Sequence, residues 1–98
     1  MVKHVILWTL KDEVKDKDAV RIAAKEALEA LVGKIEGLVS LNVNINPMAS
    51  SNVDMMLDSE FMSQEALQVY AKHPAHVFVA DTYVRPYTAS RSCIDYEI

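Results

Sequence analysis

The fold is decided by the stretch Val2-Lys3-His4-Val5-Ile6-Leu7-Trp8-Thr9-Leu10. It is apolar at nearly every position and rich in β-branched and aromatic residues, which is typical of a strand covered on both faces. Residues 1–98 are the length of a single domain, which has few elements with which to cover both faces of a sheet. We therefore expect a second copy of the chain to supply the other cover, in a twofold homodimer that packs sheet against sheet.

A helix and two strands are expected after this segment. Apolar residues recur at helical spacing from Val20 to Ile35. The caps available to this helix are Asp16 or Asp18 at its start and Gly33 or Gly37 near its end. Apolar and polar residues then alternate from Val39 to Asn46, which predicts a strand with one buried face. A third strand is expected from Val53 to Phe61.

The second half of the chain repeats the order helix, then strand. Ser63 is suited to cap a helix that runs to Ala71, and Pro74 must break or redirect it. A short helical segment is expected over residues 75–83, and a last strand over residues 88–97 places Arg91, Cys93 and Asp95 on one face. The resulting order is the α+β, ferredoxin-like β-α-β-β-α-β pattern with an antiparallel sheet, in which the helices cover one face.

Composition excludes several classes of function. The net charge is -4 and the basic residues are scattered, which argues against a nucleic-acid partner. Cys93 is the single cysteine, so the chain has no internal disulfide, and a reducing compartment fits best. No apolar run approaches the roughly 20 residues that span a bilayer. We expect a cytoplasmic protein without a membrane partner.

The densest chemistry lies in Tyr70-Ala71-Lys72-His73-Pro74-Ala75-His76. If the chain turns at Pro74, His76 can act as a general base with Tyr70 as the hydrogen-bond donor to an oxyanion. Alternatively, both side chains bond backbone groups freed by the helix break. His73 has the same two interpretations, a chemical role or a cap. His4 either lines a pocket or is a hydrogen-bonded core histidine.

Metal and haem chemistry are weaker alternatives. His4, His73 and His76 match a three-histidine count, but no carboxylate stands at ligand spacing. Haem degradation needs a roomy pocket and an axial ligand that the sequence does not single out. Cys93 has no base beside it in sequence and is interpreted as an unreactive thiol. We expect neither a metal nor a cofactor.

Four features together resemble one known family: Lys3-His4-Val5, the strand from Asp54 to Phe61, Tyr70-x-x-His73-Pro74-x-His76, and Asp95. The chain resembles the stress-responsive A/B-barrel (Dabb) domain over essentially its whole length. The resemblance implies a dimeric α/β barrel, in which two ferredoxin-like protomers pack their sheets together. It also implies a small cavity between each sheet and its own helices.

The resemblance also implies site residues. One plant member of the family is a polyketide cyclase that closes its substrate by aldol condensation; its pocket tyrosine, main catalytic histidine and first-strand histidine match Tyr70, His76 and His4. A further histidine of that enzyme matches Met55 here, so the lining is less polar. The implied function is a cofactor-free cyclase, lyase or isomerase acting on an apolar carbonyl compound, with His4, His73 and Met55 contacting the substrate. The alternative is a noncatalytic stress-related dimer that binds a hydrophobic ligand.

Overall fold

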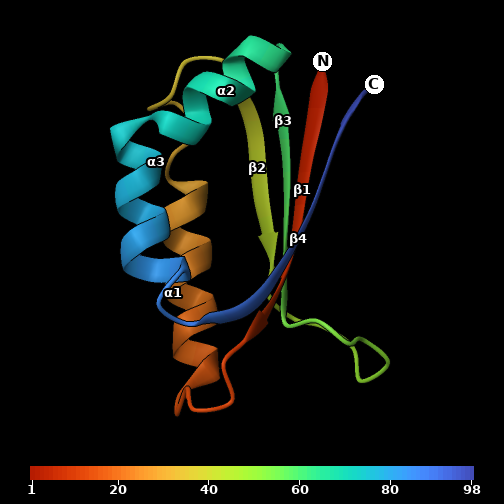
Figure 1. The fold of residues 1–98 in the computed structure, drawn as a ribbon, viewed down its shortest axis with the longest axis vertical. Helices are drawn as coiled ribbons and strands as arrows, with labels where there is room; N and C mark the ends of the chain where they lie inside the picture. The colour runs from red at the N-terminus through yellow and green to blue at the C-terminus, as the bar shows by residue number, and fades with distance from the viewer.

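The computed structural model describes residues 1–98 and contains one four-stranded sheet with helices on one side (Figure 1). The elements are β1 Val2–Leu10, α1 Lys17–Glu29, β2 Leu38–Asn44, β3 Met55–Phe61, α2 Gln64–Lys72, α3 Pro74–Val79, the π-helical turn η1 Ala80–Val84 and β4 Thr88–Glu97. The strand order is β2-β3-β1-β4 and every neighbouring pair is antiparallel. This confirms the ferredoxin-like pattern. None of the helices is long and apolar enough to cross a membrane.

The first helix begins as expected and ends earlier. Asp16 is the N-cap, and its carboxylate accepts the Ala19 N–H at 3.0 Å. The helix ends at Glu29, although the helical spacing of apolar residues continues to Ile35. Leu31 and Ile35 remain in the core because the chain continues in hydrogen-bonded turns before it reaches β2.

The second and third strands differ from the prediction at their ends. The register of β2 against β3 shifts between Leu38 and Ser40. The shift leaves Val39 42% exposed and puts Leu38 into the core, so the alternation starting at Val39 was wrong at its first residue. β2 also ends at Asn44 instead of Asn46. β3 begins two residues late because Asp54 is engaged with the end of β1: its carboxylate accepts the Leu10 N–H at 2.7 Å.

The break at Pro74 redirects the chain without ending its helical course. α2 is capped by Ser63, whose hydroxyl accepts the Ala66 N–H at 3.1 Å, as predicted. Pro74 is the first residue of α3, where its missing N–H costs no hydrogen bond. α3 then passes into η1, a π-helical turn that the sequence pattern did not indicate. Together α3 and η1 run beside α1 on the same side of the sheet (Figure 1).

The two faces of the sheet have different surroundings. Along β1 the residues alternate between buried and half-buried, and the buried set faces the helices and the hydrophobic core. The other face, which we call the outer face, is uncovered in the single chain. Its apolar side chains form a continuous group across three strands: Val5, Leu7, Met56, Ile94 and Tyr96. The prediction that β1 is covered on both faces therefore holds for one face of the isolated chain.

Gly37 offers a test of this packing. Its φ is +89°, and a Cβ added there would lie 2.6 Å from the Cβ of Ala66 on α2. Gly37→Ala is expected to destabilise the protein by about 2–5 kcal/mol, because left-handed geometry costs about 1–2 kcal/mol and overpacking about 1–3 kcal/mol. Gly33, at φ +88° with nothing near its added Cβ, is the matched control, and Gly33→Ala should lose only the first contribution. Urea unfolding measures both, and equal losses would contradict the close contact.

Candidate functional site

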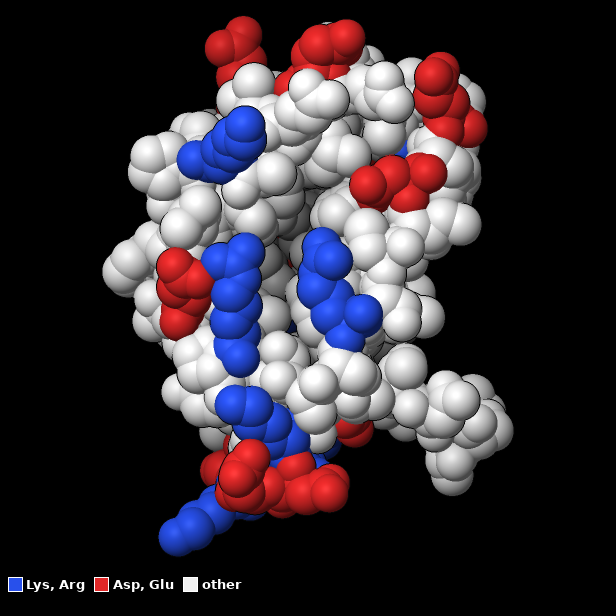
Figure 2. Space-filling view, viewed as in Figure 1, with Lys and Arg blue, Asp and Glu red and all other residues white.

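A cavity of about 580 Å³ lies between the sheet and the helices α2, α3 and η1. Its apolar lining includes Ile6, Trp8 and Leu28. Exposed residues such as Gln68 and Arg91 also line it, so the cavity opens to solvent. Figure 2 shows this side of the molecule, where a hollow separates the helical layer from β4. Cavities of this volume accommodate small molecules.

His76 and Tyr70 lie against each other in this cavity. Their ring centroids are 4.1 Å apart and the planes are tilted by 30°. The redirection at Pro74 brings these residues together, although six positions separate them in sequence. Nδ1 of His76 donates a hydrogen bond to the Ala71 carbonyl at 3.3 Å. Because a carbonyl only accepts, the proton is on Nδ1, and Nε2 carries a free lone pair.

Electrostatics keep His76 neutral. Burial lowers its pKa below the ordinary value of 6.5, and the positive charges of Arg85 and Arg91, together with His4, act in the same direction. The hydrogen bond to Ala71 opposes the shift but does not outweigh it. A neutral imidazole is the form that accepts a proton.

Tyr70 is in its acidic form, with the proton on the phenol, whereas His76 is in its basic form. Its side chain is buried and makes an edge contact with Phe61, with ring centroids 4.9 Å apart. Burial raises the pKa of Tyr70, so the phenol stays protonated at neutral pH. The hydroxyl makes no hydrogen bond with the rest of the chain. The cavity thus contains a neutral base next to an unpartnered donor.

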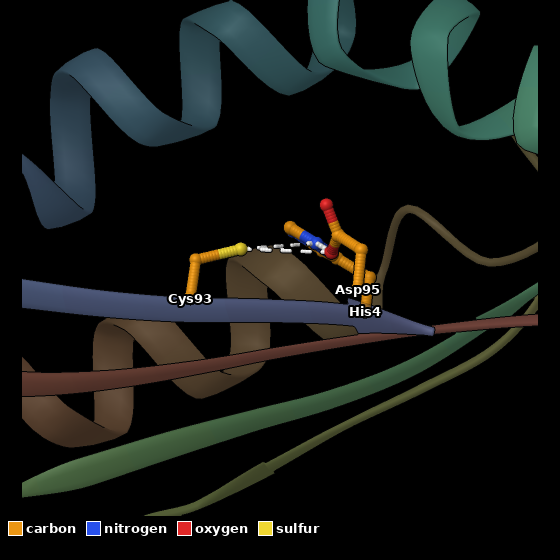
Figure 3. A group of neighbouring side chains, drawn as sticks. All are labelled: His4, Cys93 and Asp95. Carbon is orange, nitrogen blue, oxygen red and sulfur yellow. Dashed lines mark hydrogen bonds and ion pairs between the residues drawn. The ribbon is translucent and has the colours of Figure 1, made fainter. Parts of the chain in front are cut away.

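His4 lies at the sheet side of the same cavity. It pairs directly with Asp95 in the β1–β4 register, and Nδ1 of His4 lies 2.5 Å from Oδ1 of Asp95. Figure 3 shows both side chains, with Cys93, rising from the sheet toward the helices. Sγ of Cys93 lies 3.7 Å from Nδ1 of His4 and donates to Oδ1 of Asp95 at 3.5 Å.

These three side chains are also the donor types that bind metals, and their ligand atoms lie within 4.8 Å of one another. They differ from the three-histidine set considered from the sequence. Burial and the Asp95 carboxylate raise the pKa of Cys93, which keeps the thiol protonated and unreactive. His4, Cys93 and Asp95 satisfy one another through hydrogen bonds, and we assign them no metal.

The structure places three of the five predicted site residues in the cavity lining: His4, Tyr70 and His76. His73 does not line it, because its Nδ1 accepts the Ala75 N–H at 3.1 Å and caps α3. Met55 is 1% exposed, packs in the core opposite Trp8 of β1, and lies outside this lining. We therefore correct the substrate-binding set by leaving out His73 and Met55.

The two arginines of the cavity lining, Arg85 and Arg91, were given no role in the site from the sequence. Period-two alternation put Arg91 on one face with Asp95, but it did not indicate that this face points toward the helices. Arg85 follows η1; a helical segment was expected to reach residue 83, but its π-helical last turn, which places Arg85, was not indicated by the local pattern.

Comparison with known proteins identifies the family. The model of the stress responsive A/B barrel domain, Dabb, matches residues 2–98. The chain belongs to this family. A dimeric protein of unknown function from Bacteroides fragilis, with a ferredoxin-like fold, is 35% identical, with a TM-score of 0.91 over 99% of this chain and 95% of its own.

Two further relatives extend the comparison. An uncharacterised protein of Streptomyces coelicolor is 34% identical over 80 residues, covering 78% of this chain and 79% of its own. The crystal structure of an Arabidopsis thaliana protein is 27% identical, with a TM-score of 0.82 over 100% of this chain and 95% of its own. The Dabb fold expected from the sequence is thereby confirmed, while membership leaves the reaction of an individual Dabb protein open.

Proposed function

We propose that this Dabb protein is a cofactor-free enzyme of the cyclase, lyase or isomerase type that acts on an apolar carbonyl compound. The observation that carries the proposal is the solvent-open cavity in which a neutral His76 stacks on a protonated Tyr70 whose hydroxyl has no partner. Neighbouring groups whose environments hold them in different protonation states are typical of acid–base sites.

The chemistry begins with proton abstraction. Nε2 of His76 takes a proton from the carbon next to a carbonyl, and the C–H electron pair becomes the enolate. The Tyr70 hydroxyl donates a hydrogen bond to the enolate oxygen. In an isomerase the imidazolium returns the proton to another carbon. In a cyclase the enolate carbon attacks a second carbonyl of the same molecule, and the new alkoxide takes the proton.

The competing interpretation is a noncatalytic dimer in which this cluster stabilises the helix break. The bond from His76 to the Ala71 carbonyl is what that interpretation requires. It also requires a backbone partner for Tyr70 and a filled interior, and the structure has neither. A purely structural cluster therefore accounts for one of the two side chains.

A homodimer through the outer faces of the sheets is part of the proposal. The Bacteroides fragilis protein is dimeric. Here the outer face carries Ile94 and Tyr96, which are 60% and 44% exposed in the single chain. An apolar face of this kind is typical of a surface buried by a partner. A cytoplasmic location, with Cys93 reduced, completes the proposal.

Proton exchange on a surrogate ketone tests the proposed function although the physiological substrate is unknown. β-Benzoylpropionate, a stable aryl ketone acid, has a CH₂ group next to its ketone whose replacement by CD₂ in D₂O is followed by proton NMR. The protein is expected to accelerate this exchange above the rate in buffer. Exchange at the buffer rate for this compound and for its methyl ester would contradict the proposed base.

Tyr70→Phe is expected to lower the protein-catalysed exchange rate by about 10²- to 10³-fold, the usual loss for one oxyanion donor. The change removes only the hydroxyl, so the packing against Phe61 and His76 is retained. Tyr87→Phe is the matched control, because Tyr87 lies outside the cavity lining. A rate for Tyr70→Phe equal to that of the control would remove Tyr70 from the mechanism.

A further inference from the structure

We propose that Arg85 and Arg91 form a carboxylate-binding subsite at one end of the cavity, so that the substrate is a keto acid and not a neutral ketone or ester. The inference rests on the proposed function for the keto group, and on the structure for the acid. Both arginines line the cavity, one from the helical layer and one from the sheet. Figure 2 shows two basic side chains on opposite sides of the hollow.

The register of β4 against β1 gives the cavity a positive and a negative end. On the face toward the helices, Arg91 lies opposite Trp8 and Asp95 lies opposite His4. Four residues of extended strand place the backbone positions of Arg91 and Asp95 roughly 13 Å apart. Glu97 also lines the cavity and lies beyond Asp95, opposite Val2. Both acidic groups are therefore displaced toward the same end, away from Arg91.

The two arginines retain free donors. Arg91 has no carboxylate partner among the ion pairs of the chain. Arg85 is held by Asp81 through one guanidinium nitrogen, with Nη1 2.5 Å from Oδ1. A guanidinium has five N–H donors, so one such contact leaves others available. Arginine is the side chain that best matches the planar, two-oxygen geometry of a carboxylate.

Asp95 forms no ion pair with either arginine, and its carboxylate is bonded to His4 and Cys93. The positive charges of Arg85 and Arg91 also act on His76, because both lower its pKa. An acid bound between the arginines would therefore lie near His76. The substrate is oriented with its carboxylate at the arginine end and its keto group toward His76, over the apolar lining that includes Trp8.

A matched pair of ligands tests the subsite directly. Titration calorimetry of the full chain with β-benzoylpropionate and with its methyl ester compares an acid with a neutral compound of nearly the same shape. The wild-type protein is expected to bind the acid at least about tenfold more tightly, as one charged hydrogen-bonded contact implies. Arg85→Leu and Arg91→Leu should each reduce this preference, and the double variant should remove it while the ester affinity stays unchanged.

The matched control is Lys34→Leu, which removes an exposed positive charge outside the cavity. It should keep the full preference for the acid. Equal affinity of the wild type for acid and ester would overturn the subsite, and so would the absence of binding by both at millimolar concentration. Competition by inorganic phosphate as strong as that of the acid would also overturn it, because the arginines would then bind any small anion.

The outcome is separable from that of the proposed function. His76→Ala should lower the catalysed exchange rate by about 10²- to 10⁴-fold but keep the preference for the acid, since the arginines are unchanged. If the wild-type protein prefers the acid but does not catalyse exchange, the subsite proposal stands and the proposed enzymatic function is wrong. If the protein catalyses exchange but binds the acid and the ester with equal affinity, the proposed enzymatic function stands and the subsite proposal is wrong.

Discussion

His76→Ala is expected to lower the catalysed exchange rate by about 10²- to 10⁴-fold, the usual contribution of a positioned general base. The imidazole contributes the lone pair on Nε2, whereas the other imidazole beside Tyr70, that of His4, makes only an edge contact at 6.4 Å and is bonded to Asp95. The fold should be retained, because the start of α3 depends on Pro74 and on the His73 cap. Proton NMR exchange rates and circular dichroism on the same samples measure the two effects separately.

His73→Ala is the matched control for this variant. It removes a histidine from the same segment, but one whose Nδ1 caps α3 outside the cavity. The expected result is a loss of about 1 kcal/mol in the free energy of unfolding, as for other N-caps, with the exchange rate retained. If His76→Ala exchanged as fast as His73→Ala, the base would have to be another group.

The pH profile gives a second readout of the same base. Because the pKa of His76 is lowered, the neutral form dominates above the ordinary value of 6.5. The exchange rate should therefore rise with pH only in the acid range and be level from about pH 6.5 to 8. Arg91→Leu removes one of the charges that lower this pKa, so the rising part of the profile should move to higher pH. A profile that still climbs steeply through pH 8 would contradict a neutral His76.

The sequence pattern predicted the type and order of the elements because each has a strong local signal. The apolar run from Val2 to Leu10, the alternation in β3 and the caps at Asp16 and Ser63 are all decided by neighbouring residues. The places where the structure differs from the predicted elements depend on contacts between residues far apart in the sequence. The bulge at Leu38 is set by pairing with β3, and no property of Leu38 itself distinguishes it from Val39.

For the site as for the fold, the sequence predicted the features that neighbouring residues determine and not those that depend on distant contacts. A proline between Tyr70 and His76 indicates that the chain turns back, and the turn does bring the two rings together. The arginines could not be assigned, because Arg91 acquires its place only through the register of β4 against β1. Met55 was included because it matches a pocket histidine of the plant cyclase and because methionines around this strand can line a pocket, but its burial opposite Trp8 places it in the core.

The proposed dimer makes the remaining large prediction. Leu7 lies at the centre of the outer face, between Met56 on β3 and Ser92 on β4. A carboxylate there would be buried against the partner's sheet without a counter-charge. Leu7→Asp is therefore expected to convert the dimer into monomers at micromolar concentration.

The twofold contact doubles the size of this effect, because both copies carry the substitution. A loss of about 2 kcal/mol per copy, typical of a central interface residue, becomes about 4 kcal/mol, or roughly a thousandfold in the dissociation constant. Ile22→Asp is the matched control, since Ile22 is an exposed apolar residue on α1, away from the outer face. Sedimentation equilibrium measures both variants, with circular dichroism as the check on folding. A Leu7→Asp protein that remains as dimeric as the Ile22→Asp control would show that the subunits do not meet through their sheets.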